Sequence, residues 1–513
     1  MQGSELQVGA EEKIEADEAL GPSAPPGAGF THRVKRAIVW RSGSQIIGQM
    51  LTWGATFLVI RMLEPSDYGL FAMTQVVLVF LNLMNGWGFA NSLVRDESIA
   101  PQKIRQAFGM LILLNGSLGL GQLMLAPAAA AYFHQPMLAD LLRVQALLYI
   151  TTPLIAVPSA LLSRDMNFKS LAHVDLAAAA LSAATMLTLA YLGYGVWTLV
   201  LGGIVLFWAR AIGLMLKTRW LVAPSFRFEG AGAMFRYGSA MVAVQSFWFI
   251  QSQSDVFIAG RVLSAHDLGL YTTALFLTQI MTHKFLPPLN EVAYSAYSRI
   301  QDDRSAVAFS FLKSVRLILL IAMPFYLGLA ATSEPLVLTV LGEKWAATAP
   351  LVRTLGLAMP FLTLQLLFTP ATNALGRPAI ALRIAISGAI TLSMAFLIGI
   401  HWGTQGMAWA WLAGLPIHLM ISAALALPVI GASPMALARA VAPALSAAGL
   451  MALLVFAIDS VLPPMAAQAR LAILVSSGGA AYGALLFLFA RRVVEEMLAL
   501  VRSRPAAPAA QAL

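Results

Sequence analysis

The chain contains no cysteine. Disulfides, thiolate metal sites and cysteine nucleophiles are therefore excluded, whereas the compartment is left open. Charge is also scarce, because 11% of the 513 residues are charged where a soluble protein carries about a quarter. Apolar residues reach 59%, enough for roughly a dozen spans of about 20 residues each. The composition excludes a soluble single-core domain and a disordered or fibrous chain, and it predicts an all-α polytopic membrane protein.

Signals for catalysis are missing as well. The sequence has no GxxxxGK[ST] loop for nucleotide phosphates and no HExxH pair, and its seven histidines are scattered. No serine has a partnering histidine and acid on neighbouring segments. We therefore expect no enzyme activity, no catalytic residue, no metal site and no cofactor.

The first 36 residues are predicted to form a disordered, acidic cytoplasmic tail. Six acidic side chains stand against the single Lys13 within the first 30 positions, and such a composition buries too little apolar surface to fold. A basic segment followed by an apolar core is missing, so the tail does not have the pattern of a cleaved signal peptide.

Apolar segments of spanning length then follow one another to residue 490. Lipid offers no hydrogen bonds, so each span has to satisfy its own backbone, and without the alternating pattern of a barrel these segments are predicted to be helices. We count about fourteen of them: 38–60, 70–93, 107–131, 138–162, 171–192, 195–216, 238–262, 270–297, 309–332, 350–374, 378–400, 405–428, 437–459 and 466–490.

The basic residues indicate the orientation of these spans. With the N-terminus placed inside, 26 of the 33 lysines and arginines fall on the inner side, six fall outside, and Lys284 alone lies in mid-span. Positive charge concentrates in cytoplasmic loops, so this distribution supports an even number of spans with both termini cytoplasmic. Topology thereby explains the net charge of +9, and a nucleic-acid partner is excluded.

A duplication divides the spans into two sets. The segment Arg61-Met-Leu-Glu-Pro-Ser-Asp-Tyr-Gly-Leu-Phe71 recurs 200 residues later as Arg261-Val-Leu-Ser-Ala-His-Asp-Leu-Gly-Leu-Tyr271. A weaker echo links Gly193–Trp197, before the sixth span, to Gly403–Trp409, before the twelfth. Each copy holds six spans, an even number, so the copies are predicted to be parallel six-helix bundles related by an axis along the membrane normal, with a binding site between them.

The predicted organisation follows from these observations. Basic and aromatic residues are mixed between the two copies, as in a segment at a membrane interface. The parts are a disordered tail (1–36), an N-terminal six-helix bundle (37–217), an interfacial cytoplasmic linker (218–235), a C-terminal six-helix bundle (236–430), transmembrane helices 13 and 14 (431–490) and a cytoplasmic tail (491–513).

Short motifs along residues 38–490 carry a family likeness. They are Arg41-Ser-Gly43, Leu63–Gly69, Gly86–Ala90, Leu161–Lys169, Gly195-Val-Trp197, Ser254–Gly260, Leu268–Tyr271 and Gly342–Trp345. In their order and spacing they resemble polysaccharide exporters of the oligosaccharide flippase family, within the multidrug/oligosaccharidyl-lipid/polysaccharide exporter superfamily.

The resemblance implies a flippase of the bacterial inner membrane. Such a protein moves a polyprenyl-diphosphate-linked oligosaccharide from the cytoplasmic to the periplasmic leaflet, for exopolysaccharide, capsule or O-antigen (lipopolysaccharide) biosynthesis. Two six-helix bundles would enclose a V-shaped central cavity that opens to each side in turn, by alternating access. The implied partners are the lipid-linked substrate, membrane lipids and a polysaccharide polymerase or co-polymerase.

Polar groups inside spans are the candidates for substrate binding, because intramembrane charge is costly. Arg41, Gln45 and Gln49 are spaced by four and share one stripe of the first span. We predict that they line the cavity and that the arginine meets phosphate at the cytoplasmic mouth. The alternative is that Arg41 reaches the headgroups and the glutamines hold helices together.

The seventh span holds the most polar stretch inside any span. Gln245, Ser252 and Asp255 cluster on one side of it and are predicted to line the cavity. Asp255 matches an acidic position of the family, where it could carry a coupling H⁺ or Na⁺ ion or pair with an arginine of the other bundle. The alternative is a structural hydrogen-bond hub.

The eighth span carries Gln279, Lys284 and Glu291 around Pro287-Pro288. The prolines remove backbone donors and are predicted to kink or break the helix, so that freed carbonyls face a cavity. Lys284 is the candidate phosphate contact after Arg41. The alternative is an ion pair between Lys284 and Glu291 across the kink.

Four arginines are candidates for gates. Arg61 and Arg261 occupy equivalent periplasmic turns, and Arg164 and Arg377 occupy corresponding cytoplasmic ends. Local contacts with the aspartate of each turn are the alternative for the first pair, and the cytoplasmic bias of positive charge is the alternative for the second.

Three rival functions remain open. A cation-coupled small-molecule or drug antiporter of the same superfamily should carry an acid inside its first bundle, where only Asp175 lies near a span. A flippase for the peptidoglycan precursor lipid should open its first span with an Arg-Asp step, where this chain has Arg41-Ser42. A non-transporting membrane partner of a polysaccharide synthase is disfavoured by the intramembrane polar residues and the duplication.

Overall fold

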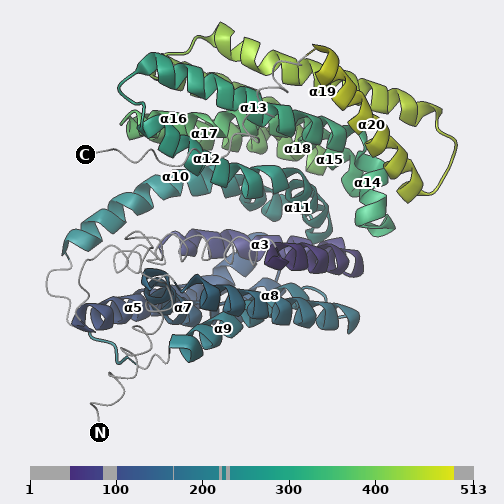
Figure 1. Cartoon of the computed structure of the whole chain (residues 1–513). Coiled ribbons are helices and arrows are strands. Elements are labelled where there is room, and N and C mark those ends of the chain that lie inside the picture. Colours follow the sequence, from purple (N-terminus) through teal and green to yellow (C-terminus); the bar gives the residue numbers. More distant parts are fainter. Residues whose placement is uncertain (1–46, 85–100, 166, 219–221, 227–231, 490–513) are drawn as a thin grey trace, which may run out of the picture.

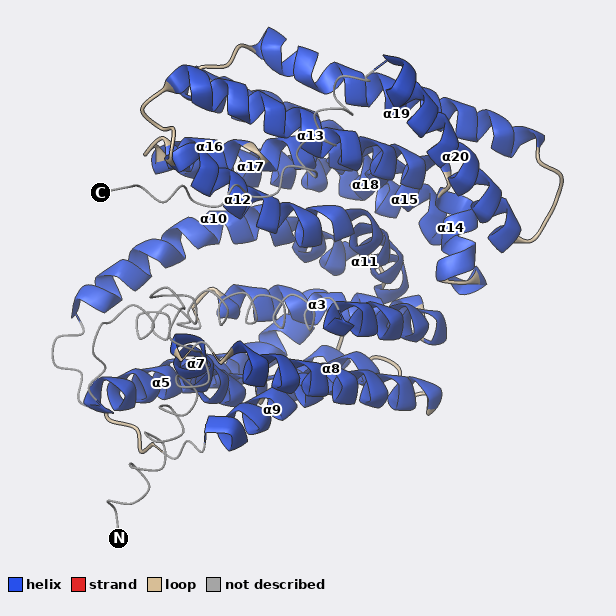
Figure 2. Ribbon diagram, in the orientation of Figure 1, coloured by secondary structure: helices blue, strands red, loops and turns tan. Residues whose placement is uncertain are grey.

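The computed structural model describes residues 47–84, 101–165, 167–218, 222–226 and 232–489. Throughout this part of the chain the structure is helical and holds no strand, as the sequence predicts (Figure 2). The predicted tails, residues 1–36 and 491–513, lie outside the described residues.

The helices form two layered groups that follow the order of the chain (Figure 1). The first group begins with a helix over residues 47–62. It continues with α3 (Pro65–Asn82), α5 (Pro101–Phe133), α6 (Met137–Gln145), α7 (Leu148–Arg164), α8 (Phe168–Tyr191) and α9 (Trp197–Thr218).

The second group runs from α10 to the yellow helices at the upper edge of Figure 1. It comprises α10 (Gly232–Val262), α11 (Ala265–Ile280), α12 (Leu286–Ser298), α13 (Arg304–Ala331), α14 (Ser333–Val340), α15 (Ala349–Leu366), α16 (Phe368–Ala374), α17 (Pro378–Gly399), α18 (Gly403–Ile430), α19 (Pro434–Val461) and α20 (Ala467–Phe489). Shorter turns join some of these helices: the π-helix η1 (Met281–Phe285) and the 3-10 helices η2 (Glu343–Thr348) and η3 (Ile400–Trp402).

The described residues of each predicted apolar segment are mostly helical, with short turns inside a few segments, such as residues 146–147. Within the described ranges, nine helical stretches are long and apolar enough to cross a membrane. One of them, Pro378–Ile430, joins α17 and α18. The chain is thus a multi-pass helical membrane protein, and the count of fourteen spans stays a prediction.

Local sequence sets where several helices begin. Asn167, Ser264, Asp303 and Ser433 each accept a backbone N–H from the first turn of α8, α11, α13 and α19, respectively. Such side chains satisfy donors that have no partner within the helix. Proline stands in the first turn of α3, α15, α17 and α19, where a missing N–H costs no hydrogen bond.

The largest apolar core joins the two groups. Ile60, Met73 and Phe133 of the first group share one buried cluster with Tyr271 and Trp345 of the second. A further core packs α19 against α13, and three small residues spaced by four on α19 (Ala440, Ala444 and Ala448) are buried in it. Small residues let helix backbones approach closely in lipid. Helix α20 contacts α19 and α14, so these last helices pack on the second group.

Part of the predicted interfacial linker is described. Residues 222–226 lie along the start of α5, where the Ser225 amide donates to the Arg105 carbonyl at 2.8 Å. The Arg105 Nε atom donates in return to the Ala223 carbonyl at 3.1 Å. The segment that follows the first group is therefore attached to that group.

Candidate functional site

The two groups meet where α3 crosses α11, at the turn motif that the sequence repeats. A Cβ atom added at Gly69 would overlap the carbonyl oxygen of Ala265, and one added at Gly269 would overlap the carbonyl oxygen of Pro65. The contact is reciprocal, because each glycine faces the helix start of the other copy, and equivalent positions are 200 residues apart. The two backbones thus approach more closely than any side chain would permit.

Trp345 of η2 reaches across this crossing. Its indole Nε1 donates to the Ile60 carbonyl at 3.0 Å, and its ring stands edge-on to Tyr68 with 5.6 Å between centroids. The tryptophan side chain is fully buried. It therefore anchors the second group to the end of the first helix of the other group.

Charged side chains surround the crossing on its exposed rim. Lys344 Nζ lies 2.7 Å from Glu64 Oε1. Arg61 Nη1 donates to the Thr339 carbonyl at 3.3 Å. Both contacts join the first group to the second, and Arg61 is one of the residues predicted to act in a gate.

Arg261, the counterpart of Arg61 in the repeat, also reaches across. Its guanidinium lies 4.8 Å from the ring centroid of Tyr132 on α5. The same tyrosine ring stacks on Phe257 of α10 at 4.5 Å. The structure thus places both predicted outer arginines between the groups, and their action as gates stays a prediction.

The aspartates of the two repeated turns each accept a hydrogen bond from the residue at the N-cap of their own helix. Asp67 Oδ2 accepts from the Glu64 amide at 3.0 Å, and Asp267 Oδ2 accepts from the Ser264 hydroxyl at 2.8 Å. Burial raises the pKa of the Asp67 carboxyl, and hydrogen bonds from the amides of Glu64 and Val196 oppose that rise. Neither aspartate pairs with the arginine of its turn in the described structure, so the local Arg–Asp contact is not formed.

Asp255 is buried in the second group, with 2% of its surface exposed. Its Oδ2 accepts a hydrogen bond from the Tyr271 hydroxyl at 3.0 Å. The Tyr271 hydroxyl oxygen in turn accepts one from the Trp411 indole Nε1 at 2.7 Å. Oδ1 and the hydroxyl of Ser254 are buried and have no described partner. The residues of this hydrogen-bond chain all belong to the second group, and Asp255 forms no ion pair with a described arginine. Its role in lining the cavity stays a prediction.

A second buried polar cluster lies deeper between α10, α17 and α18. A Cβ atom added at Gly388 would stand 2.7 Å from Gln251 Oε1 and 2.9 Å from the His418 ring. His418 is fully buried. Its Nε2 atom and the Ser422 hydroxyl have no partner in the described chain. The sequence did not single out His418, because a lone histidine in an apolar helix carries no motif.

The structure describes only some of the other predicted cavity residues of the first helix and of α10. Gln49 is half-buried in the first helix, whereas Arg41 and Gln45 lie outside the described residues. Gln245 belongs to α10, but its side chain is outside the description. Ser252 is half-buried and donates to a carbonyl of its own helix at 3.3 Å. Their role in lining a cavity stays a prediction.

Lys284 stands on the π-helix η1, and its side chain is exposed. Among described residues it has no hydrogen bond or ion pair, and the predicted alternative of a pair with the exposed Glu291 is not formed. Gln279 is half-buried just before η1. Pro287 and Pro288 occupy the first turn of α12, where their missing amides cost little. The predicted break is thus replaced by a π-helix, through which the chain stays helical.

The two inner arginines sit at helix ends. Arg164 is half-buried at the last residue of α7, and Arg377 is exposed immediately before α17. These positions agree with the sequence-based placement at helix ends, and a gating role for either residue stays a prediction.

Comparison with known proteins identifies relatives along most of the chain. The family model described as "Polysaccharide biosynthesis protein" matches residues 58–350, which is more than half of the sequence. The succinoglycan biosynthesis transport protein ExoT of Rhizobium meliloti is 26% identical over 374 residues, covering 72% of this chain and 76% of ExoT. The lipopolysaccharide biosynthesis protein WzxC of Escherichia coli is 22% identical over 356 residues, covering 66% and 72%.

Solved structures share the fold. The lipid II flippase MurJ, in an inward closed conformation, superposes with a TM-score of 0.72 at 13% identity, over 89% of this chain and 100% of MurJ. An inward-facing multidrug resistance MATE family transporter of the MOP superfamily superposes with a TM-score of 0.60 at 16% identity, over 77% of this chain and 98% of the transporter. The fold is therefore that of these transporters, and the family match shows that the chain belongs to the polysaccharide biosynthesis protein family.

Proposed function

We propose that this protein is an inner-membrane flippase that works by alternating access. It moves polyprenyl-diphosphate-linked oligosaccharide units from the cytoplasmic to the periplasmic leaflet, for surface polysaccharide biosynthesis. The observation that carries the proposal is the closure between two helix groups at one end, built by the repeated turn motif. Such a contact between repeats can open while each group stays packed.

The names of the relatives support the substrate class. ExoT is named a succinoglycan biosynthesis transport protein, WzxC a lipopolysaccharide biosynthesis protein, and TuaB of Bacillus subtilis a teichuronic acid biosynthesis protein. These are three different polysaccharides, so what the substrates share is a saccharide, and the particular sugar varies. A polysaccharide polymerase or co-polymerase is the partner that would consume the translocated unit.

The distribution of basic residues supports translocation from the cytoplasmic to the periplasmic leaflet. With most lysines and arginines on the inner side and both termini cytoplasmic, the crossing of α3 and α11 lies at the periplasmic end. The structure then corresponds to the state that is closed to the periplasm. That is the state in which a carrier loads its substrate from the cytoplasmic leaflet.

Lys284 is the residue best placed to meet the diphosphate. An unpaired, exposed ammonium within a span is costly unless it faces water or an anionic ligand. The π-helix that carries it adds to the case, because π-turns are frequent at functional sites. Arg41, at the predicted cytoplasmic mouth, would be the second cation for the same group.

Asp255 is the candidate for coupling transport to H⁺ or Na⁺. A buried carboxylate with one phenol donor and no cation is expensive while it is charged, and its free Oδ1 could take up a proton or an ion. Antiport of drugs is less well supported, because the acid near a span of the first group, Asp175, is neutralised by Arg210 at 2.8 Å.

The function is tested first in cells. Deleting the gene should abolish the surface polysaccharide and accumulate lipid-linked repeat units in the cytoplasmic leaflet. Unchanged polysaccharide without such accumulation would sink the flippase proposal.

The site is tested with purified protein in vesicles. Lys284→Ala should lower translocation of the lipid-linked unit about tenfold or more at unchanged membrane levels, since a charge-assisted contact with phosphate contributes roughly 1.5–3 kcal/mol. The exposed Lys217→Ala on α9 is the matched control. Asp255→Asn in the same assay should remove the dependence on a proton or sodium gradient. Wild-type translocation in Lys284→Ala would assign this lysine a structural role.

A further inference from the structure

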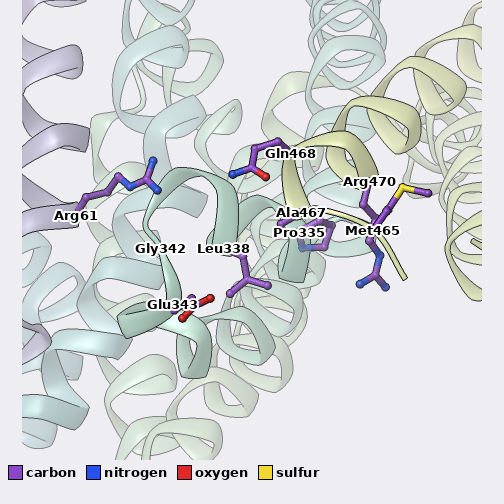
Figure 3. A pocket seen from close by; sticks show the side chains of 9 residues that line it. All are labelled: Arg61, Pro335, Leu338, Gly342, Glu343, Met465, Ala467, Gln468 and Arg470. Carbon is purple, nitrogen blue, oxygen red and sulfur yellow. The ribbon is translucent and has the colours of Figure 1, made fainter. Parts of the chain in front are cut away.

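A cavity of about 490 Å³ lies beside the crossing, where the second group turns from one spanning helix to the next (Figure 3). Its wall is formed by α14, the turn into η2 and the start of α20, together with Arg61 from the first group. Its volume falls within the range of small-ligand sites. The wall elements follow the end of α13 and the end of α19, which places the cavity at the level of the membrane interface.

One unpaired charge of each sign lines the cavity. Arg61 uses Nη1 for the Thr339 carbonyl, and its other N–H groups have no partner in the described chain. The exposed Glu343 carboxylate has no partner there either. Arg470 also lines the cavity, but Asp459 holds its guanidinium at 2.6 and 2.9 Å. A ligand with one anionic group and one cationic group would therefore complement the charges of the cavity.

The rest of the lining narrows the ligand class. Pro335, Leu338 and Met465 provide apolar surface, and Gln468 adds an amide from the wall that faces Arg61 in Figure 3. No aromatic ring is among the lining residues, so the flat stacking surface that commonly holds a sugar ring is missing. Charges of both signs beside aliphatic surface, at interface depth, match a zwitterionic phospholipid.

We propose that this cavity binds the headgroup of a zwitterionic phospholipid, such as phosphatidylethanolamine, from the outer leaflet. The phosphate pairs with the Arg61 guanidinium, the ammonium pairs with the Glu343 carboxylate, and the Gln468 amide donates to a phosphate oxygen. Charge-assisted bonds of this kind are stronger than neutral ones.

The position of the site links the lipid to the conformation of the protein. Arg61 belongs to the first group, whereas the other lining residues belong to the second. The cavity is complete only while the two groups are in contact, so a bound headgroup stabilises the closed crossing by its preference for that state. This effect rests on the alternating access of the proposed function, and the choice of leaflet rests on its orientation, but the binding of the headgroup itself rests on neither.

The experiment measures lipid binding by the purified full-length chain with native mass spectrometry. We expect phosphatidylethanolamine to bind more tightly than phosphatidylglycerol. Glu343→Gln should weaken the binding of phosphatidylethanolamine about three- to tenfold, as for loss of one partly exposed charged contact, and should not weaken the binding of anionic phosphatidylglycerol. Gln468→Leu, on the opposite wall, should weaken both lipids. Asp302→Asn, an exposed carboxylate outside the cavity, is the matched control.

Three outcomes would overturn the proposal. Equal binding of phosphatidylethanolamine to the wild type and to Glu343→Gln removes the ammonium contact. Equal competition by soluble phosphoethanolamine at the same concentration shows that a free headgroup, and not the lipid, is the ligand. Loss of binding in Asp302→Asn shows a general charge effect. None of these measurements uses transport, so a failure here is distinguishable from a failure of the flippase proposal.

Discussion

Replacing Gly69 or Gly269 by alanine should separate α3 from α11 and open the closed end of the protein. The added Cβ atom would lie 2.7 Å from the Ala265 carbonyl carbon in the first variant and 2.5 Å from the Pro65 carbonyl carbon in the second, besides overlapping their oxygens. Ordinary contact begins near 3.4 Å. Because backbone atoms cannot rotate away as side chains do, the helices have to move apart by about 1 Å or more.

The free-energy cost of the added methyl group to the closed crossing can be estimated. Overpacking a tight contact costs about 1–3 kcal/mol, which corresponds to a shift of roughly 5- to 150-fold in the equilibrium between closed and open crossing. In an ordinary helix the same substitution stabilises by about 0.5–1 kcal/mol. The two effects have opposite signs, so a helix-propensity effect cannot imitate the predicted opening.

The natural absence of cysteine makes the assay clean. A bifunctional thiol-reactive cross-linker between Glu64→Cys and Lys344→Cys, whose native side-chain ends meet at 2.7 Å, reports the closed crossing, and the yield of the cross-link should fall in the alanine variants. Gly121→Ala and Gly203→Ala are matched helical controls, because nothing lies within 4 Å of a Cβ atom added at either position. Cross-linking and translocation at control levels in both crossing variants would refute the reasoning.

Two further predictions concern the buried tryptophan at the crossing and a helix start. Trp345→Phe loses the donor to the Ile60 carbonyl, worth about 1 kcal/mol, so the same cross-link should form a few-fold less; an unchanged yield would contradict this. Hydrogen bonds from a serine hydroxyl and two backbone amides hold the pKa of the exposed Asp303 below its usual value, so its stabilisation is present above the unfolded pKa of about 3.9 and is lost as pH falls through the folded pKa. Thermal midpoints measured between about pH 5 and pH 2 should therefore fall more in the wild type than in Asp303→Asn, and parallel curves would contradict the role of this carboxylate.

Much of the architecture could be predicted from the sequence, because a long apolar segment in lipid has to satisfy its backbone hydrogen bonds by forming a helix. The duplication also predicted that Gly69 and Gly269 occupy equivalent turns. It did not predict that these turns touch each other, since a repeat gives equivalence and leaves contact open. The weaker echo between the copies opens on a glycine of positive φ in each, Gly193 at 77° and Gly403 at 66°.

The candidate site was less accessible to sequence reasoning. Asp255 stood out as an intramembrane acid, but its partner Tyr271 is 16 residues away, and Trp411, which donates to Tyr271, is 156 residues away along the chain. No sequence pattern pairs these residues. Trp345 lies within a quoted family motif, yet its anchor is a backbone carbonyl that no side-chain pattern encodes. The π-helix at Lys284 also escaped prediction, because hydropathy does not distinguish one helical pitch from another.

The contacts that hold the crossing closed contribute different amounts of free energy. Variants that remove them should therefore open the crossing to different extents. An exposed ion pair such as Lys344–Glu64 contributes about 0–1 kcal/mol. Aromatic pairs between the groups, such as Tyr68 on Trp345 at 5.6 Å, add about 0.5–1.5 kcal/mol each. Every one of these contacts can be lost while the rest persist. The paired glycines act differently, because a single added carbon prevents the backbones from approaching and so weakens all the other contacts together. A variant at Gly69 should therefore shift the closed state more than the loss of any one rim contact.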